Sequence, residues 1–96
     1  MIIVKYTELV SDRQAFERDV QGLFSGLTAI NGIHDVRLIP GKPLRDNRYD
    51  LIIKIHMEES ALNTYDESEI HKKWKREYDR FVLKKAIFDC EDVDYK

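Results

Sequence analysis

The amino-acid sequence predicts an α+β domain of the ferredoxin-like type, a four-stranded antiparallel sheet with helices on one face. Two observations lead to this prediction. Four short segments are rich in apolar and β-branched residues, and two longer segments carry apolar residues at helical intervals, in the order strand, helix, strand, strand, helix, strand. The chain has 96 residues, enough for one domain with one core, so residues 1–96 are expected to form a single domain.

A strand and an amphipathic helix open the chain. Met1–Tyr6 is rich in β-branched and aromatic residues, which favour a strand. Ser11 and Gln14 have the spacing of a capping box, which marks the beginning of a helix. We expect this helix to end near Gly32, because glycine takes the left-handed conformation at little cost. The apolar side of the helix consists of Phe16, Val20, Leu23, Phe24, Leu27 and Ile30.

Two further strands are predicted in the middle of the chain. The first spans 33–39 and is stopped by the proline and glycine residues of 40–43, which cannot continue a ladder. A polar connection, 44–48, leads to the second, which spans 49–57. In this strand, alternation separates Leu51, Ile53, Ile55 and Met57 from Ile52, Lys54 and His56.

The segment Tyr65–Phe81 is predicted to be the second long helix, after a short helical turn at 60–65. Ile70, Trp74, Tyr78 and Phe81 share one side of it, and basic residues lie opposite. Asp66 and Glu69 have capping-box spacing at its start, and Lys84 and Lys85 at its end complement the helix dipole.

The last predicted strand is Ala86–Cys90, followed by an acidic tail at 91–96. Helices would then cover one face of the sheet and leave the other to solvent. An apolar face of this size normally marks an interface, so we expect a symmetric homodimer formed face to face. The residues assigned to this face include Met1, Ile3, Val36, Leu38, and Ile87 or its neighbours.

Composition narrows the class of protein. With 43% hydrophobic and 35% charged residues, the chain is typical of a soluble globular domain, and its net charge of -2 provides no general attraction for nucleic acid. The apolar start is interrupted at Lys5, so neither a signal peptide nor a membrane span is expected. Cys90 is the single cysteine and cannot form an internal disulfide, which favours a cytoplasmic location.

Several motifs also resemble a known family. The segment 61–65 reads Ala-Leu-Asn-Thr-Tyr, His71 follows six residues after Tyr65, and 84–89 reads Lys-Lys-Ala-Ile-Phe-Asp. In this order and spacing, over nearly the whole chain, they resemble the stress-responsive A/B barrel family of dimeric α+β barrel proteins. The resemblance implies a homodimer whose two sheets close into a barrel, with a pocket in each subunit between helices and sheet. The walls of that pocket would include Ile2, Val4, Tyr6, Trp74 and Tyr78.

The resemblance also suggests two site residues. Many members carry His-Pro-x-His before the main helix, whereas this chain has Ser-Glu-Ile-His at 68–71 and keeps only the second histidine. A plant cyclase of the family uses that histidine, a tyrosine matching Tyr65 and a histidine on the first strand. The first-strand position falls before Met1 here, so Tyr65 and His71 alone carry over. Residues that could replace the missing partner are Tyr6, Tyr49 and Lys54.

Each of these two residues has two interpretations. His71 is either a pocket acid/base or a structural histidine satisfied by a backbone carbonyl. Tyr65 either donates a hydrogen bond to a carbonyl or enolate oxygen, or only packs at the start of the helix.

The remaining polar residues predict no second site. His56 is expected on the sheet face away from the helices and His34 in a turn, and the histidine spacing indicates neither a metal site nor a haem ligand. Acidic residues interrupt the basic side of the second helix, which favours a solvated surface over an RNA site. Acidic neighbours disfavour a nucleophilic Cys90. No cofactor is predicted.

Three functions are consistent with these patterns. The first is the binding of a small apolar or aromatic molecule, with a stress-related role implied by the resemblance. The second is a cofactor-free cyclase or lyase, in which His71 moves a proton and Tyr65 stabilises an oxyanion. The third is a dimeric interaction module without a ligand. A cavity reached by both residues would favour the first two functions, and a closed core around His71 the third.

Overall fold

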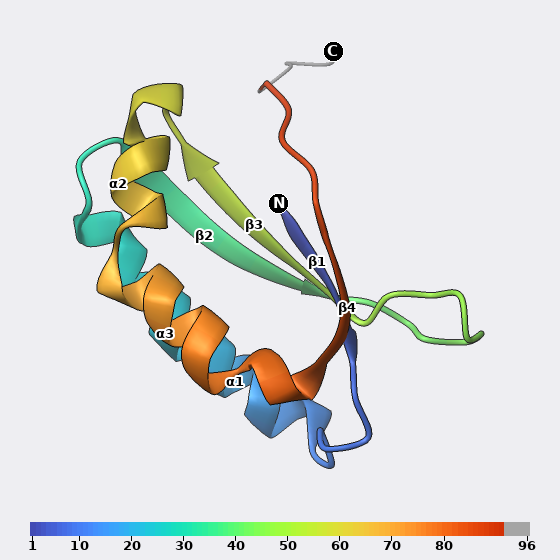
Figure 1. Cartoon of the computed structure of the whole chain (residues 1–96). Helices are drawn as coiled ribbons and strands as arrows, with labels where there is room; N and C mark the ends of the chain where they lie inside the picture. The colour runs from blue at the N-terminus through green and yellow to red at the C-terminus, as the bar shows by residue number, and fades with distance from the viewer. Residues whose placement is uncertain (92–96) are drawn as a thin grey trace.

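The computed structural model describes residues 1–91, as four strands and three α-helices in two layers (Figure 1). The strands pair antiparallel in the order β2-β3-β1-β4, and the helices lie together on one face. This is an α+β architecture with an open sheet, compatible with the predicted ferredoxin-like fold. The elements are β1 Ile2–Tyr6, α1 Arg13–Ser25, β2 Ile33–Pro40, β3 Leu51–Met57, α2 Leu62–Asp66, α3 Glu69–Glu77 and β4 Val82–Ile87.

The core lies between the helices and the sheet. Ile2, Val4 and Tyr6 point toward the helices, as the alternation in β1 predicts, and all three are buried. Burial of this apolar surface supplies the main driving force for folding. The other buried apolar residues are Val20, Phe24, Leu27, Ile33, Val36, Leu51, Ile53, Ala61, Tyr65, Trp74 and Tyr78.

The helix α1 begins one residue later than expected. Asp12, not Ser11, is the N-cap, and its carboxylate accepts a hydrogen bond from the Ala15 N–H at 3.1 Å. The helix ends at Ser25 and continues as a 3-10 turn, η1 Gly26–Ala29. The α-helix therefore ends well before Gly32, contrary to the prediction, although the φ of +93° at Gly32 is in the left-handed region that favours glycine.

The prediction of one continuous helix over Tyr65–Phe81 is wrong. The chain forms a 3-10 turn, η2 Glu59–Ala61, then α2, and the separate helix α3. Ser68, not Asp66, caps α3: its hydroxyl donates to the Tyr65 carbonyl at 2.7 Å and accepts from the His71 N–H at 3.1 Å. One serine therefore closes the first helix and opens the next.

The end of α3 and the start of β4 also differ from the prediction. After α3 comes a 3-10 turn, η3 Asp79–Phe81, and β4 starts at Val82, four residues before the predicted Ala86–Cys90. Lys84 and Lys85 belong to this strand, while the last turn of α3 carries Lys75 and Arg76. The strand lies at the sheet edge and has no fully buried residue. Its sequence therefore does not need the alternation of apolar residues by which a strand is recognised. Residues 92–96 of the predicted acidic tail lie outside the described part.

The prediction that Val36 and Leu38 lie on the face away from the helices is wrong, because β2 contains a β-bulge. The register between β2 and β3 shifts between Ile33 and Asp35, and this extra residue reverses the alternation that follows. Val36 and Leu38 therefore lie on the helix side, as do their partners on β3. Ile87 pairs with the buried Ile2 and also belongs to that side, although it is exposed.

Candidate functional site

Tyr65 and His71 meet where α2 passes into α3. Their ring centroids are 4.6 Å apart, with the ring planes inclined by 41°. The break at Ser68 makes this contact possible, because residues six positions apart face different sides of a continuous helix. The structure thus brings together the two side chains that the sequence suggested as a catalytic pair.

His71 is held by a backbone carbonyl. Its Nδ1 lies 3.0 Å from the carbonyl oxygen of Asp66, and the side chain is half-buried. A carbonyl only accepts hydrogen bonds, so Nδ1 carries a hydrogen in this contact, and a ring that is protonated at Nδ1 alone has its lone pair on Nε2. This is the partner expected of a structural histidine, and the same contact would orient a general base.

Tyr65 is buried, with 7% of its surface exposed. Burial, and then the negative charges of Asp66 and Asp89, raise the pKa of this phenol above its ordinary value. The hydroxyl is therefore protonated at neutral pH. Within residues 1–91 it makes no hydrogen bond, so it retains a donor for another group.

The five predicted pocket walls lie in the core. Ile2, Val4, Tyr6, Trp74 and Tyr78 are all buried there. The Trp74 ring packs edge-on to Phe24, with centroids 5.3 Å apart, and stacks with Tyr78 at 5.5 Å. Their role as walls of a ligand pocket stays a prediction.

The helix layer of the described chain includes surface hollows at two places on α1. One lies beside Ala15 and Phe16 on α1. The other lies between α1 and α3, and Gly22, Lys73 and Tyr78 contribute to its lining. Neither hollow includes Tyr65 or His71, so neither is the cavity that the ligand hypothesis requires.

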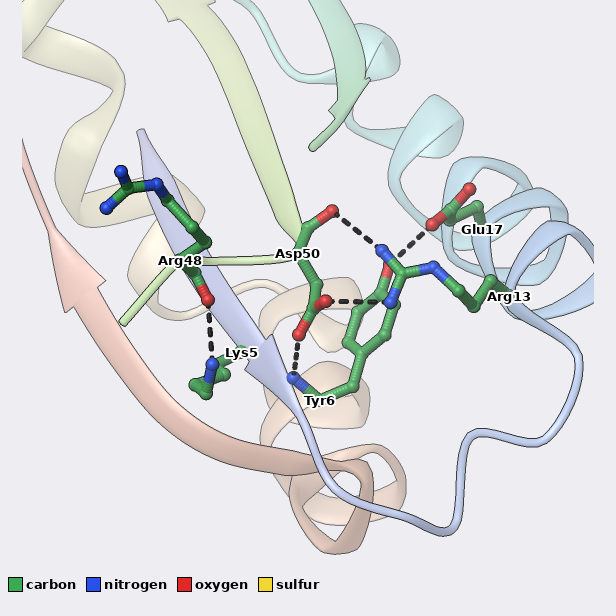
Figure 2. Close-up of polar contacts among 6 residues, drawn as sticks. All are labelled: Lys5, Tyr6, Arg13, Glu17, Arg48 and Asp50. Carbon is green, nitrogen blue, oxygen red and sulfur yellow. Dashed lines mark hydrogen bonds and ion pairs between the residues drawn. The ribbon is translucent and has the colours of Figure 1, made fainter. Parts of the chain in front are cut away.

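A buried polar cluster centres on Asp50, a residue that the sequence patterns did not single out (Figure 2). This carboxylate is 5% exposed. It accepts hydrogen bonds from the Tyr6 backbone N–H and from Arg13 Nη1, both at 2.7 Å. Its partners come from β1 and α1, so no local spacing could have revealed the cluster. It joins the start of β3 to both elements.

Both tyrosines near α1 use their hydroxyls within the fold. Tyr6 donates to Glu17 Oε2 at 2.8 Å and Tyr78 to Asp19 Oδ2 at 2.9 Å. Burial and the hydrogen bond to Asp19 raise the pKa of Tyr78 to about 12, and burial with the bond to Glu17 raises that of Tyr6. Since its hydroxyl binds Glu17, Tyr6 does not serve as the partner of His71 in this structure.

The sheet face away from the helices carries a row of apolar residues across all four strands. Ile39 lies opposite Ile52, Ile52 opposite Ile3, and Ile3 opposite Ala86. Residues directly opposite on paired strands share a face. Ile39 is 45% exposed and the other three residues are half-buried. We call Ile39, Ile52, Ile3 and Ala86 the apolar row, and this side of the sheet the open face.

The other two histidines also lie on strands. His56 is opposite Asp35 on the open face, as predicted, whereas His34 lies in β2 at the bulge and not in a turn. Their ring centroids are 5.3 Å apart. Within residues 1–91, no group of three or more His, Cys, Asp or Glu side chains is placed to hold a metal ion. The described helices include none with the length and apolar character needed to span a membrane.

No protein-family model matches this sequence, and no curated protein is significantly similar to it. The resemblance to the stress-responsive A/B barrel family therefore stays a prediction that depends on the motifs at 61–65, His71 and 84–89.

Proposed function

We propose that this chain is a homodimeric module in which two copies pack their open faces together to form an α+β barrel. The apolar row is the observation that carries the proposal. It crosses the full width of the sheet, and the helices of the same chain lie on the opposite side (Figure 1). A second copy would remove these isoleucines from water, which is the main source of free energy in protein association.

Packing around the predicted pocket favours this function over ligand binding in the helix layer. Trp74 and Tyr78 stack in the core, and both described hollows lie away from Tyr65 and His71. Stacked aromatic rings at these wall positions are the arrangement expected of an interaction module.

The molecular mass in solution tests the proposal. We expect a dimer at micromolar concentration by sedimentation or light scattering, and a monomer for Ile52→Lys, which places a charge in the apolar row. Leu62→Lys is the matched control, because Leu62 is a 40% exposed residue of α2 on the helix layer. Circular dichroism checks that both variants fold. A monomeric wild-type protein, or a dimer that Ile52→Lys does not weaken, would contradict the proposal.

A second candidate function is the binding of a small apolar or aromatic molecule near Tyr65 and His71, with or without proton transfer. It is favoured by one observation: the Tyr65 hydroxyl donor and the Nε2 lone pair of neutral His71 both remain available in the described chain, on adjacent rings. In an enzyme, His71 would move the proton and Tyr65 would stabilise the oxyanion.

A compound screen tests this second function. Polyketide-like and quinone-like compounds are incubated with wild type, His71→Ala and Tyr65→Phe, with His34→Ala as a control at an exposed histidine of β2. Loss of general acid–base catalysis should reduce turnover by roughly 10²–10⁴-fold in His71→Ala. Turnover and affinity that do not respond to either substitution would leave Tyr65 and His71 with packing roles only.

A further inference from the structure

The open face carries two cross-strand pairs of like charge. Arg37 of β2 lies opposite Lys54 of β3, and Lys5 of β1 lies opposite Lys84 of β4. The two pairs flank the apolar row, each displaced from it by two residues along its strands, or about 7 Å. Directly opposed like charges destabilise a sheet, so the isolated chain gains nothing from this arrangement.

These cations are poorly compensated by the chain itself. Arg37, Lys54 and Lys84 form no ion pair with any carboxylate of residues 1–91, and Lys5 donates its Nζ hydrogen to the Arg48 carbonyl at 2.7 Å (Figure 2). The whole chain has a net charge of -2. The open face thus gathers positive charge on a chain whose net charge is negative, and this clustering needs a physical explanation.

Dimerisation makes this charge more costly. Lys5 and Lys54 are already half-buried in the single chain. Packing two open faces together would bring eight cations, four from each copy, into a space with little water, against one Asp35 carboxylate from each copy. Charges removed from water need partners of opposite sign, and negative groups bound between the sheets would supply them.

We propose that the space between the two open faces binds an organic anion with an apolar body, such as a medium-chain carboxylate. The carboxylate is held by Arg37 and Lys54, whose donors suit a planar oxyanion. The hydrocarbon part lies along the apolar row, with Ile39 and Ile52 nearest the charged end. This inference rests on the dimer proposed above and names the class of ligand that completes it.

Calorimetric titration with dodecanoate below its micelle concentration tests the inference. We expect saturable binding that weakens as salt is raised, since ions screen the contact. Dodecyltrimethylammonium has the same chain with the opposite charge and is expected not to bind. Acetate, which has the charge without the chain, should bind at least a hundredfold more weakly, because burial of each methylene adds to affinity.

Two matched double variants test the residues. Arg37→Gln with Lys54→Gln removes one guanidinium and one ammonium from the open face and should weaken dodecanoate binding by about tenfold or more. Lys75→Gln with Arg76→Gln removes the same two groups from exposed positions of α3 and should leave binding unchanged. Ile52→Lys, which separates the copies, should also lose binding.

Measuring molecular mass in the same samples separates the two proposals. A wild-type dimer that does not bind dodecanoate, or that binds the cationic detergent equally well, would overturn the inference and leave the dimer intact. Equal weakening by both double variants would overturn it too. A wild-type monomer would refute the dimer itself, and with it the ligand site between the copies.

Discussion

The two faces of the sheet satisfy their polar groups in opposite ways. On the helix side, the Asp50 carboxylate pairs with Arg13, and Tyr6 and Tyr78 donate to carboxylates of α1. Within residues 1–91, every side-chain nitrogen or oxygen that is sealed from solvent has a hydrogen-bond partner, and the unpaired Tyr65 hydroxyl is not among the sealed atoms. On the open face, cations lie opposite cations. The helix side therefore pairs its charges within one chain, whereas the opposed cations of the open face weaken the sheet to which they belong.

The largest predicted effect is a difference in unfolding free energy between substitutions of two adjacent isoleucines of β3, which point to opposite faces of the sheet. Ile53 is fully buried on the helix side, so Ile53→Ala should lower the free energy of unfolding by about 3 kcal/mol. Ile52→Ala on the open face should cost less than about 1 kcal/mol in dilute solution. Urea denaturation at two protein concentrations measures both costs, and the cost at Ile52 should grow with concentration if the copies associate. Equal costs at every concentration would remove the distinction between the faces.

The Asp50 contacts should have the next largest effect. Asp50→Asn keeps an acceptor for the Tyr6 N–H but removes the negative charge beside Arg13, so we expect a loss of about 2 kcal/mol in unfolding free energy. Asp35→Asn is the control, because Asp35 is an exposed carboxylate of the open face, and should change stability by less than about 0.5 kcal/mol. A larger loss at Asp35 than at Asp50 would contradict this account of the helix side.

Tyr78→Phe removes a hydrogen bond to Asp19 and should cost about 1 kcal/mol at neutral pH. The pKa of Tyr78 rises from 10.0 to about 12 on folding, so the unfolded chain releases this proton first, and its contribution to stability falls as pH rises from 10 to 12. The stability difference between wild type and Tyr78→Phe should therefore shrink over that range. Denaturation at pH 8 and pH 11 measures it, and an unchanged difference would show that folding does not perturb this phenol.

The smallest predicted effect is a gain in the stability of the single chain. Lys54→Glu replaces the opposed cations Arg37 and Lys54 with an ion pair across two strands, which should stabilise the single chain by about 0.5 kcal/mol. High salt should abolish the gain. The same substitution should weaken dodecanoate binding. A variant that is more stable but binds dodecanoate less well would show that Lys54 lowers the stability of the chain and contributes to binding of the ligand. Destabilisation at low salt would argue against charge repulsion there.

The candidate site could be predicted only in part. Tyr65 and His71 emerged from the order of local motifs, and the fold confirms that they are neighbours. Asp50 went unrecognised because its partners, Tyr6 and Arg13, are 44 and 37 residues away in the sequence. The position of Ser68 between two helices was also missed, because a hydrogen-bonding serine and a simple helical residue look alike in a hydrophobic pattern.

Local patterns in the chain were enough to predict the order of the elements, the buried side of β1 and β3, and the left-handed turn at Gly32. Each of these depends on the spacing of residues within one segment. Strand pairing, in contrast, sets where β4 begins and which residues of β2 reach the open face. It also places cations opposite one another there. These features depend on a bulge and on the register between strands, which are fixed by pairing with distant residues and leave no local period in the chain.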